Sequence, residues 1–247
     1  MPRSALAEED IVAFRRRAVD AAVHLFAAQG YAAVTMRSLG AALGVSTMTT
    51  YRYIAGKDEL FVLVRAEAFR RFADALVLAL AAAPPGDPVA RLFALKRAYI
   101  AFAVAQPDAY RSMFELRGAE PPKGPARDEL AAQSRRAFAC LHGCVVDAVA
   151  HGYLQGDPLT HAHLFWASTH GLCSLHLAGQ LSEARLQVLA RELWELGASI
   201  ASASQKRALQ PGNDASERQK MPRQSPQPAK RPSARPRKKS TRKRRIR

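Results

Sequence analysis

The sequence predicts an all-α fold with an N-terminal three-helix helix-turn-helix domain, a C-terminal helical domain and a disordered basic tail. Apolar residues recur at the spacing of amphipathic helices throughout residues 10–200. No run of four or more residues alternates apolar and polar side chains between turn signals, as an exposed strand would. The last 43 residues hold six prolines and almost no large apolar side chains, which predicts disorder. The predicted boundaries are 10–72, 73–202 and 203–247.

The helix ends follow from local signals. Gly30 ends the first amphipathic stretch, Thr35 and Ser46 are good N-caps, and Gly44 and Gly56 break the chain between helices. Prolines and glycines separate the later helices in the same way. The expected helices lie at about 10–29, 35–43, 46–53, 58–82, 88–105, 107–117, 126–153, 160–178 and 182–200.

The positive charge is concentrated in the tail. Residues 205–247 hold 16 Lys and Arg against two acids, so they carry +14 of the chain's formal net charge of +16. Such a segment binds phosphate polymers by counterion release without reading sequence. A solubilising tail without a selected partner is the alternative. The rest of the chain is nearly neutral.

The compartment is expected to be the cytoplasm, with association to the nucleoid. The cysteines Cys140, Cys144 and Cys173 are too few for a disulfide framework, and the N-terminus has no apolar stretch typical of a signal peptide. Between Asp157 and Glu183 no Asp, Glu, Lys or Arg occurs. Four histidines in that stretch favour a helix buried on both sides over a membrane span.

Residues 39–53 are organised as a helix-turn-helix. Gly44 accommodates a positive φ, and Val45 is expected to anchor the turn in the core. The following helix presents mostly small or polar side chains. These let a helix approach the DNA major groove, donate to phosphates and touch thymine methyl groups. An ordinary helical hairpin is the alternative on spacing alone.

Residues 35–60, TMRSLGAALGVSTMTTYRYIAGKDEL, strongly resemble the DNA-binding signature of TetR-family transcriptional regulators. The preceding residues 21–31 resemble the first helix of that family, and the match spans about residues 12–72. The resemblance implies a homodimer whose N-terminal domains enter successive major grooves of a pseudo-palindromic operator. It also implies a C-terminal domain that dimerises and binds a small ligand, with release of a repressor as the family expectation.

Position by position, the resemblance implies base contacts by Arg37, Thr47 and Met48. Phosphate contacts are implied for Thr35, Thr49, Tyr51 and Lys57, while Arg52 could contact phosphate or merely solvate its helix. The full expected DNA-binding set is Thr35, Arg37, Ser46, Thr47, Met48, Thr49, Tyr51, Arg52 and Lys57. Lys57 is also a cation at a helix N-terminus, an unfavourable place that a bound phosphate would explain.

Three residues depart from the family pattern. Met48 replaces a small residue or Pro, which leaves the operator sequence open because Met48 could crowd the groove or favour a thymine methyl. Thr50 replaces Leu and Ile54 often replaces Phe, and both changes are expected to alter core packing only.

The C-terminal half resembles the Trp-His-Gly type of TetR C-terminal domain through WASTHGL at 166–172 and YRSMF at 110–114. The resemblance implies that the helices at 160–178 and 182–200 pair with their copies in a four-helix dimer interface. Their lack of charge fits that role, because interface cores are depleted in charge. Packing of the same faces within a monomer is the alternative.

A small, apolar ligand is expected in this half. Aromatic or soft side chains could line its cavity, although each could equally be plain core: Met113, Phe114, Phe138, Cys140, Cys144, Phe165 and Trp166. His170 could bond to the ligand or to a backbone carbonyl next to Gly171.

No metal, cofactor or catalytic activity is expected. Cys140 and Cys144 lie one turn apart, and His151, His161 and His163 follow, so Zn or Cu(I) sensing is an alternative. No paired C-x-x-C, phosphate loop, nucleophile elbow or H-E-x-x-H occurs.

The sequence therefore predicts a dimeric, ligand-released repressor that binds double-stranded DNA. An architectural nucleoid protein dominated by its basic tail is the second hypothesis. A ligand- or metal-binding protein with a vestigial DNA domain is the third.

Overall fold

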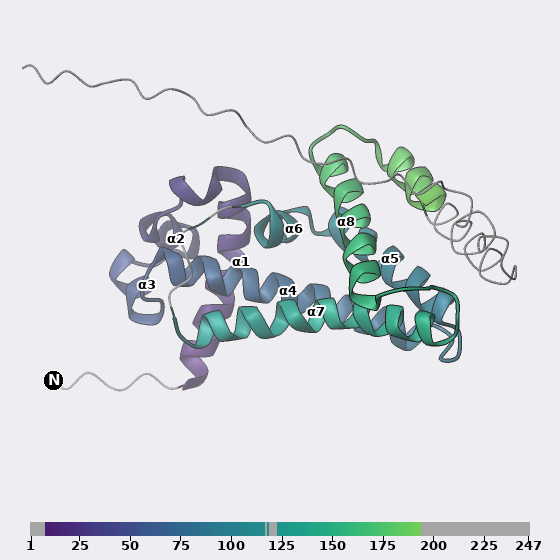
Figure 1. The fold of residues 1–247 in the computed structure, drawn as a ribbon. Helices are drawn as coiled ribbons and strands as arrows, with labels where there is room; N and C mark the ends of the chain where they lie inside the picture. The colour runs from purple at the N-terminus through teal and green to yellow at the C-terminus, as the bar shows by residue number, and fades with distance from the viewer. Residues whose placement is uncertain (1–7, 117, 119–122, 194–247) are drawn as a thin grey trace, which may run out of the picture. The chain divides into compact units, whose positions relative to one another are not determined.

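A computed structural model describes residues 8–116, 118 and 123–193, and this part of the chain is helical without strands. A further helix covers residues 183–193 (Figure 1). The all-α prediction is confirmed. The basic tail and the end of the last predicted helix lie outside the described residues. The helix bounds are α1 Glu8–Ala33, α2 Met36–Leu43, α3 Thr47–Tyr53, α4 Lys57–Ala82, α5 Pro88–Ala105, α6 Pro107–Phe114, α7 Pro125–Ala150 and α8 Pro158–Leu177.

The helix ends differ from the predicted ones by a few residues. Gly30 adopts the expected positive φ of 73°, but it makes a kink after which α1 continues to Ala33. The predicted helix 107–117 is too long, because α6 ends at Phe114. The predicted helix 126–153 is also too long, because Gly152 takes a left-handed φ of 76° just beyond Ala150.

Two hydrophobic cores form, and α4 contributes to both. Leu60 and Val64 belong to the first core, which α1, α2 and the start of α4 build around Phe26 and Leu39. Phe69 and Phe72 belong to the second core, which α4 to α8 build. The predicted domain boundary at 72/73 falls inside α4, which runs through it without a break. That boundary stays a prediction.

Helices α4 and α7 pack against each other along their length, and α5 packs against both (Figure 1). Helix α8 packs on α5 and α7, but only on one side. Its Leu164 is 62% exposed and Leu175 is also exposed. The expectation that this helix is buried on both sides is therefore wrong for the single chain. None of the described helices is long and apolar enough to cross a membrane.

Candidate nucleic-acid interface and ligand cavity

The turn between α2 and α3 is fixed by its own backbone and caps. The Thr35 hydroxyl accepts from the Ser38 amide at 3.0 Å, and the Ser38 hydroxyl accepts from the Thr35 amide at 3.0 Å. Gly44 adopts the left-handed region at φ 66° and ψ 30°. The Ser46 hydroxyl accepts from the Thr49 amide at 3.1 Å, which caps α3. All three local signals predicted from the sequence are confirmed.

Gly40 lets α2 approach the turn closely. A Cβ atom there would lie 3.0 Å from the Val45 carbonyl oxygen and 3.4 Å from the Thr47 amide nitrogen. Such contacts are tighter than ordinary packing, so only glycine fits without a shift of the turn. The need for glycine at this position was not predicted from the sequence, because the conflict arises only when the turn is folded.

The inner face of α3 is anchored to the first core. Thr50 is fully buried, and its hydroxyl donates to the Thr47 carbonyl oxygen at 2.7 Å. The Tyr53 ring stacks on Phe14 with ring centroids 4.1 Å apart. Arg15 donates from Nε to the Tyr53 carbonyl oxygen at 3.0 Å and pairs with Glu59 at 3.1 Å. The helix is thus held at both ends, and Thr50 and Ile54 act in the core as expected.

The outer face of α3 is open to solvent. Met48 is 77% exposed and Tyr51 is 51% exposed, and Arg52 is exposed beside them. Arg37 on α2 is exposed as well. None of the nine residues predicted to contact DNA is buried. A short, rigid helix with a free polar face is able to enter a DNA groove.

Lys57 has a partner within the chain. Its ammonium group donates to the carbonyl oxygens of Tyr31 at 3.1 Å and Ala32 at 3.3 Å, and it lies 4.4 Å from the centroid of the Tyr31 ring. The cation therefore compensates the C-terminal carbonyls of α1. A bound phosphate is not needed to explain this charge, and contact of Lys57 with DNA stays a prediction.

A cavity of about 570 Å³ lies in the second core, within the range of ligand sites. Of the residues predicted to line a cavity, Met113, Phe114, Phe138 and Trp166 do so. Cys140, Cys144 and His170 do not line this cavity, and contact of any of the predicted residues with a ligand stays a prediction. Cys144 is buried among the packed side chains of the second core instead.

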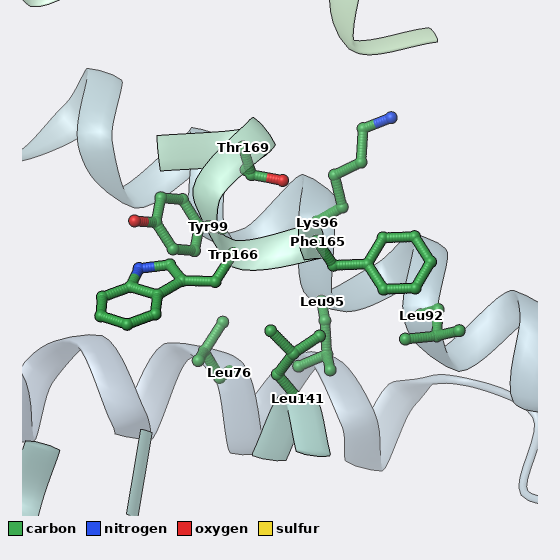
Figure 2. A pocket seen from close by; sticks show the side chains of 9 residues that line it. All are labelled: Leu76, Leu92, Leu95, Lys96, Tyr99, Leu141, Phe165, Trp166 and Thr169. Atoms are coloured by element: carbon green, nitrogen blue, oxygen red, sulfur yellow. The ribbon is translucent and has the colours of Figure 1, made fainter. Parts of the chain in front are cut away.

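Phe165 lines a second, smaller pocket of about 50 Å³. Figure 2 shows the side chains that line it, with the rings of Phe165 and Trp166 from α8 extending to opposite sides and Leu141 of α7 below them. Leu76, Tyr99, Leu141 and Trp166 border both the pocket and the large cavity. These shared side chains separate the two spaces, so a change in their rotamers alters the volume open to a ligand.

His170 bonds to tyrosine hydroxyls rather than to a backbone carbonyl, which corrects one of the two expectations. Its Nδ1 lies 2.6 Å from the Tyr110 hydroxyl and 3.3 Å from the Tyr99 hydroxyl. Burial lowers the pKa of His170 and raises the pKa of both tyrosines. The uncharged His170, Tyr110 and Tyr99 side chains thus form a hydrogen-bonded network that holds Tyr99 in place. Tyr99 lines both the small pocket and the large cavity.

Four basic residues in the cavity wall were not predicted to line it from the sequence. Arg65, Arg135, His142 and His163 line the large cavity. Arg65 follows Val64 in an apolar stretch, which was an available signal. Its position in the cavity, however, depends on how α4 packs against α7, a helix that is distant in the sequence.

The metal alternative lacks a ligand set. Among the described residues no three His, Cys, Asp or Glu side chains gather as a metal site needs. Burial raises the pKa of the Cys144 thiol to about 11, which disfavours the thiolate. His151 and His163 interact with the backbone carbonyl oxygens of Asp147 and Leu159.

Fold and site together define a class of protein: a helix-turn-helix head on a helical body that encloses a cavity. The sequence model of bacterial regulatory proteins of the tetR family matches residues 18–64. The model of the tetracyclin repressor-like C-terminal domain matches residues 92–199. The chain belongs to the TetR family.

Individual relatives agree with this family. The HTH-type transcriptional repressor DrrR1 of Streptomyces coeruleorubidus is 46% identical over 48 residues, which are 19% of this chain and 18% of the relative. The chain thus matches less than a fifth of that protein's length.

Solved structures share the fold over most of their length. The TetR-family regulator PfmR from Thermus thermophilus has a TM-score of 0.61 at 19% identity, covering 78% of this chain and 97% of its own. AibR, solved in complex with isovaleryl coenzyme A and operator DNA, has a TM-score of 0.59 at 18% identity. The match covers 74% of this chain and 96% of the AibR chain.

Proposed function

We propose that this chain is a sequence-specific DNA-binding transcriptional regulator that represses from a palindromic operator as a homodimer until a small ligand releases it. It acts in the cytoplasm, on the nucleoid. One observation carries the proposal: α3 is fixed on its inner face by Thr50 and Tyr53 while Met48, Tyr51 and Arg52 stay exposed. A helix that contacts base edges in a DNA groove needs both features, and α3 is called the reading helix from here on.

The exposed face of α8 supports the homodimer. Leu164 and Leu175 are exposed there, and a hollow lined by Gly171, Leu172 and Leu189 lies between α8 and the helix at 183–193. Contiguous apolar surface of this kind marks an interaction site. A second copy that covers it would also set two reading helices at a fixed spacing, as a palindromic operator requires.

Helix α4 supports release by a ligand. Its Phe69 and Phe72 line the cavity, while its Leu60 and Val64 pack in the first core with α1 and α2. A ligand that favours one position of α4 therefore biases the position of the reading helix. A coupling of about 1–3 kcal/mol shifts operator affinity by about 5- to 150-fold. The structure of AibR contains both a ligand and operator DNA, so a protein with this fold can bind both kinds of partner.

Selection of binding sites from random duplex DNA tests the proposal. The regulator enriches a two-fold symmetric sequence and keeps it when excess random duplex is added, because specific binding exceeds non-specific binding by orders of magnitude. An architectural protein that binds through its tail enriches no sequence and is removed by the competitor. That second outcome would overturn the proposal.

A further inference from the structure

A half-buried cation, Arg65, lines the large cavity and has no ion pair with any described residue. Arg65 extends from α4, and its Nη2 donates to the Met113 carbonyl oxygen at 3.3 Å. Its Nε is buried and has no hydrogen-bond partner among the described residues. The guanidinium also lies 5.9 Å from the centroid of the Phe61 ring, which covers it from the side of the first core.

No described carboxylate lines this cavity, and the other ionisable residues in its wall include Arg135, His142 and His163. Burial lowers the pKa of Arg65, and none of the described acids offsets this effect. Arginine nevertheless stays charged at neutral pH. A partly buried charge and a buried, unpaired N–H are both unfavourable, so an anion bound beside Arg65 would be stabilising.

Most of the remaining wall is apolar. Phe69, Phe72, Phe138, Leu141 and Trp166 contribute aromatic and aliphatic surface, which suits a hydrocarbon body rather than a sugar or nucleotide. The cavity therefore combines the half-buried Arg65, whose Nε is unpaired, with a large apolar surface. A purely apolar ligand, as the sequence suggested, would leave Arg65 uncompensated.

We propose that the cavity binds an amphipathic monocarboxylate whose headgroup pairs with Arg65 and whose hydrocarbon body fills the aromatic part. This assignment rests on the proposed ligand-released function and names the class of its ligand. A guanidinium presents a planar pair of N–H donors that matches a carboxylate. Since Arg65 belongs to α4, the pairing acts directly on the helix that joins the two cores.

Isothermal titration calorimetry on the full-length protein tests the pairing with two probes of equal chain length, decanoate and 1-decanol. Decanoate is expected to bind about 10- to 100-fold more tightly, the range of a charge-assisted hydrogen bond. Arg65→Met is expected to abolish this preference, and Arg65→Lys to retain part of it. Arg97→Met removes a positive charge from an exposed site on α5 and is expected to leave the preference for decanoate unchanged.

The control also accounts for non-specific attraction of decanoate by the basic tail, since the tail is identical in all variants. Equal affinity of the wild-type protein for acid and alcohol would overturn the assignment. So would an undiminished preference in Arg65→Met, or no binding of octanoate, decanoate and dodecanoate. If circular dichroism shows that Arg65→Met does not fold, the assignment is decided by the preference of the wild-type protein for decanoate over 1-decanol and by the size of that preference in Arg65→Lys. Operator binding is measured separately without probe, and its absence would contradict the regulator rather than the carboxylate site.

Discussion

Arg37 and Tyr51 are the residues at which DNA recognition is most directly tested. Replacing both by Ala is expected to lower affinity for the selected operator by at least 10-fold, because one bidentate arginine–guanine contact contributes about 1–3 kcal/mol. Fluorescence anisotropy at fixed salt measures the effect. Arg97→Ala removes an exposed charge on α5 and serves as control. Unchanged affinity in the double variant would mean that these residues do not read DNA.

His170 makes stability depend on pH. Burial lowers its pKa in the folded state below the ordinary 6.5, so at acidic pH the unfolded chain binds a proton that the folded chain does not. The free energy of unfolding then falls as pH drops through this value, with a slope of up to about 1.4 kcal/mol per pH unit.

Urea unfolding between about pH 5 and 7.5 is expected to show this slope, and His170→Asn is expected to reduce it. His151→Asn, at an exposed position, is the control and should keep the wild-type slope. An identical pH dependence in wild type and His170→Asn would contradict this account of the tyrosine–histidine network.

At the scale of helices, two glycines inside helices should respond oppositely to alanine. At Gly40 the added methyl group meets the Val45 carbonyl oxygen at 3.0 Å, so Gly40→Ala is expected to cost about 1–3 kcal/mol of stability and to weaken operator binding. At Gly143 nothing lies within 4 Å, so Gly143→Ala is expected to stabilise α7 by about 0.5–1 kcal/mol. Thermal unfolding measures both, and a neutral Gly40→Ala would show that the α2–turn contact adjusts freely.

The same scale shows what could be predicted from the sequence. The caps at Thr35 and Ser46 and the left-handed Gly44 were predicted because their causes are local hydrogen bonds and sterics within a few residues. Arg65 was not predicted as a wall residue, because α4 meets α7 only through tertiary packing. Helix α8 was predicted to be buried on both sides from its composition alone, and composition does not tell a core face from one that a second chain covers.

At the scale of the whole molecule, the exposed face of α8 predicts the oligomeric state. Leu175→Glu places a charge in the apolar hollow and is expected to shift the protein from dimer to monomer in sedimentation experiments. Operator affinity should fall with it, because the two reading heads are no longer linked. Leu78→Glu changes a leucine that is 72% exposed on α4 and should leave the dimer intact. A dimer that survives Leu175→Glu would place the interface elsewhere.

The basic tail, residues 205–247, is expected to strengthen binding to any DNA duplex. Deleting residues 205–247 removes +14 of the formal charge of +16, so the remaining protein is nearly neutral. Counterion release acts on any duplex, and without it binding to operator and random DNA should weaken by about the same factor. The slope of log affinity against log salt should flatten by about 0.9 for each phosphate that the tail neutralises.

Titrations of both duplexes at several salt concentrations separate the contributions of tail and reading helix. If the tail only holds the dimer near DNA, the ratio of operator to random affinity is unchanged by the deletion. A selective decrease in operator binding would instead assign sequence recognition to the tail. Because α3 is held by the first core, we expect the ratio to be preserved.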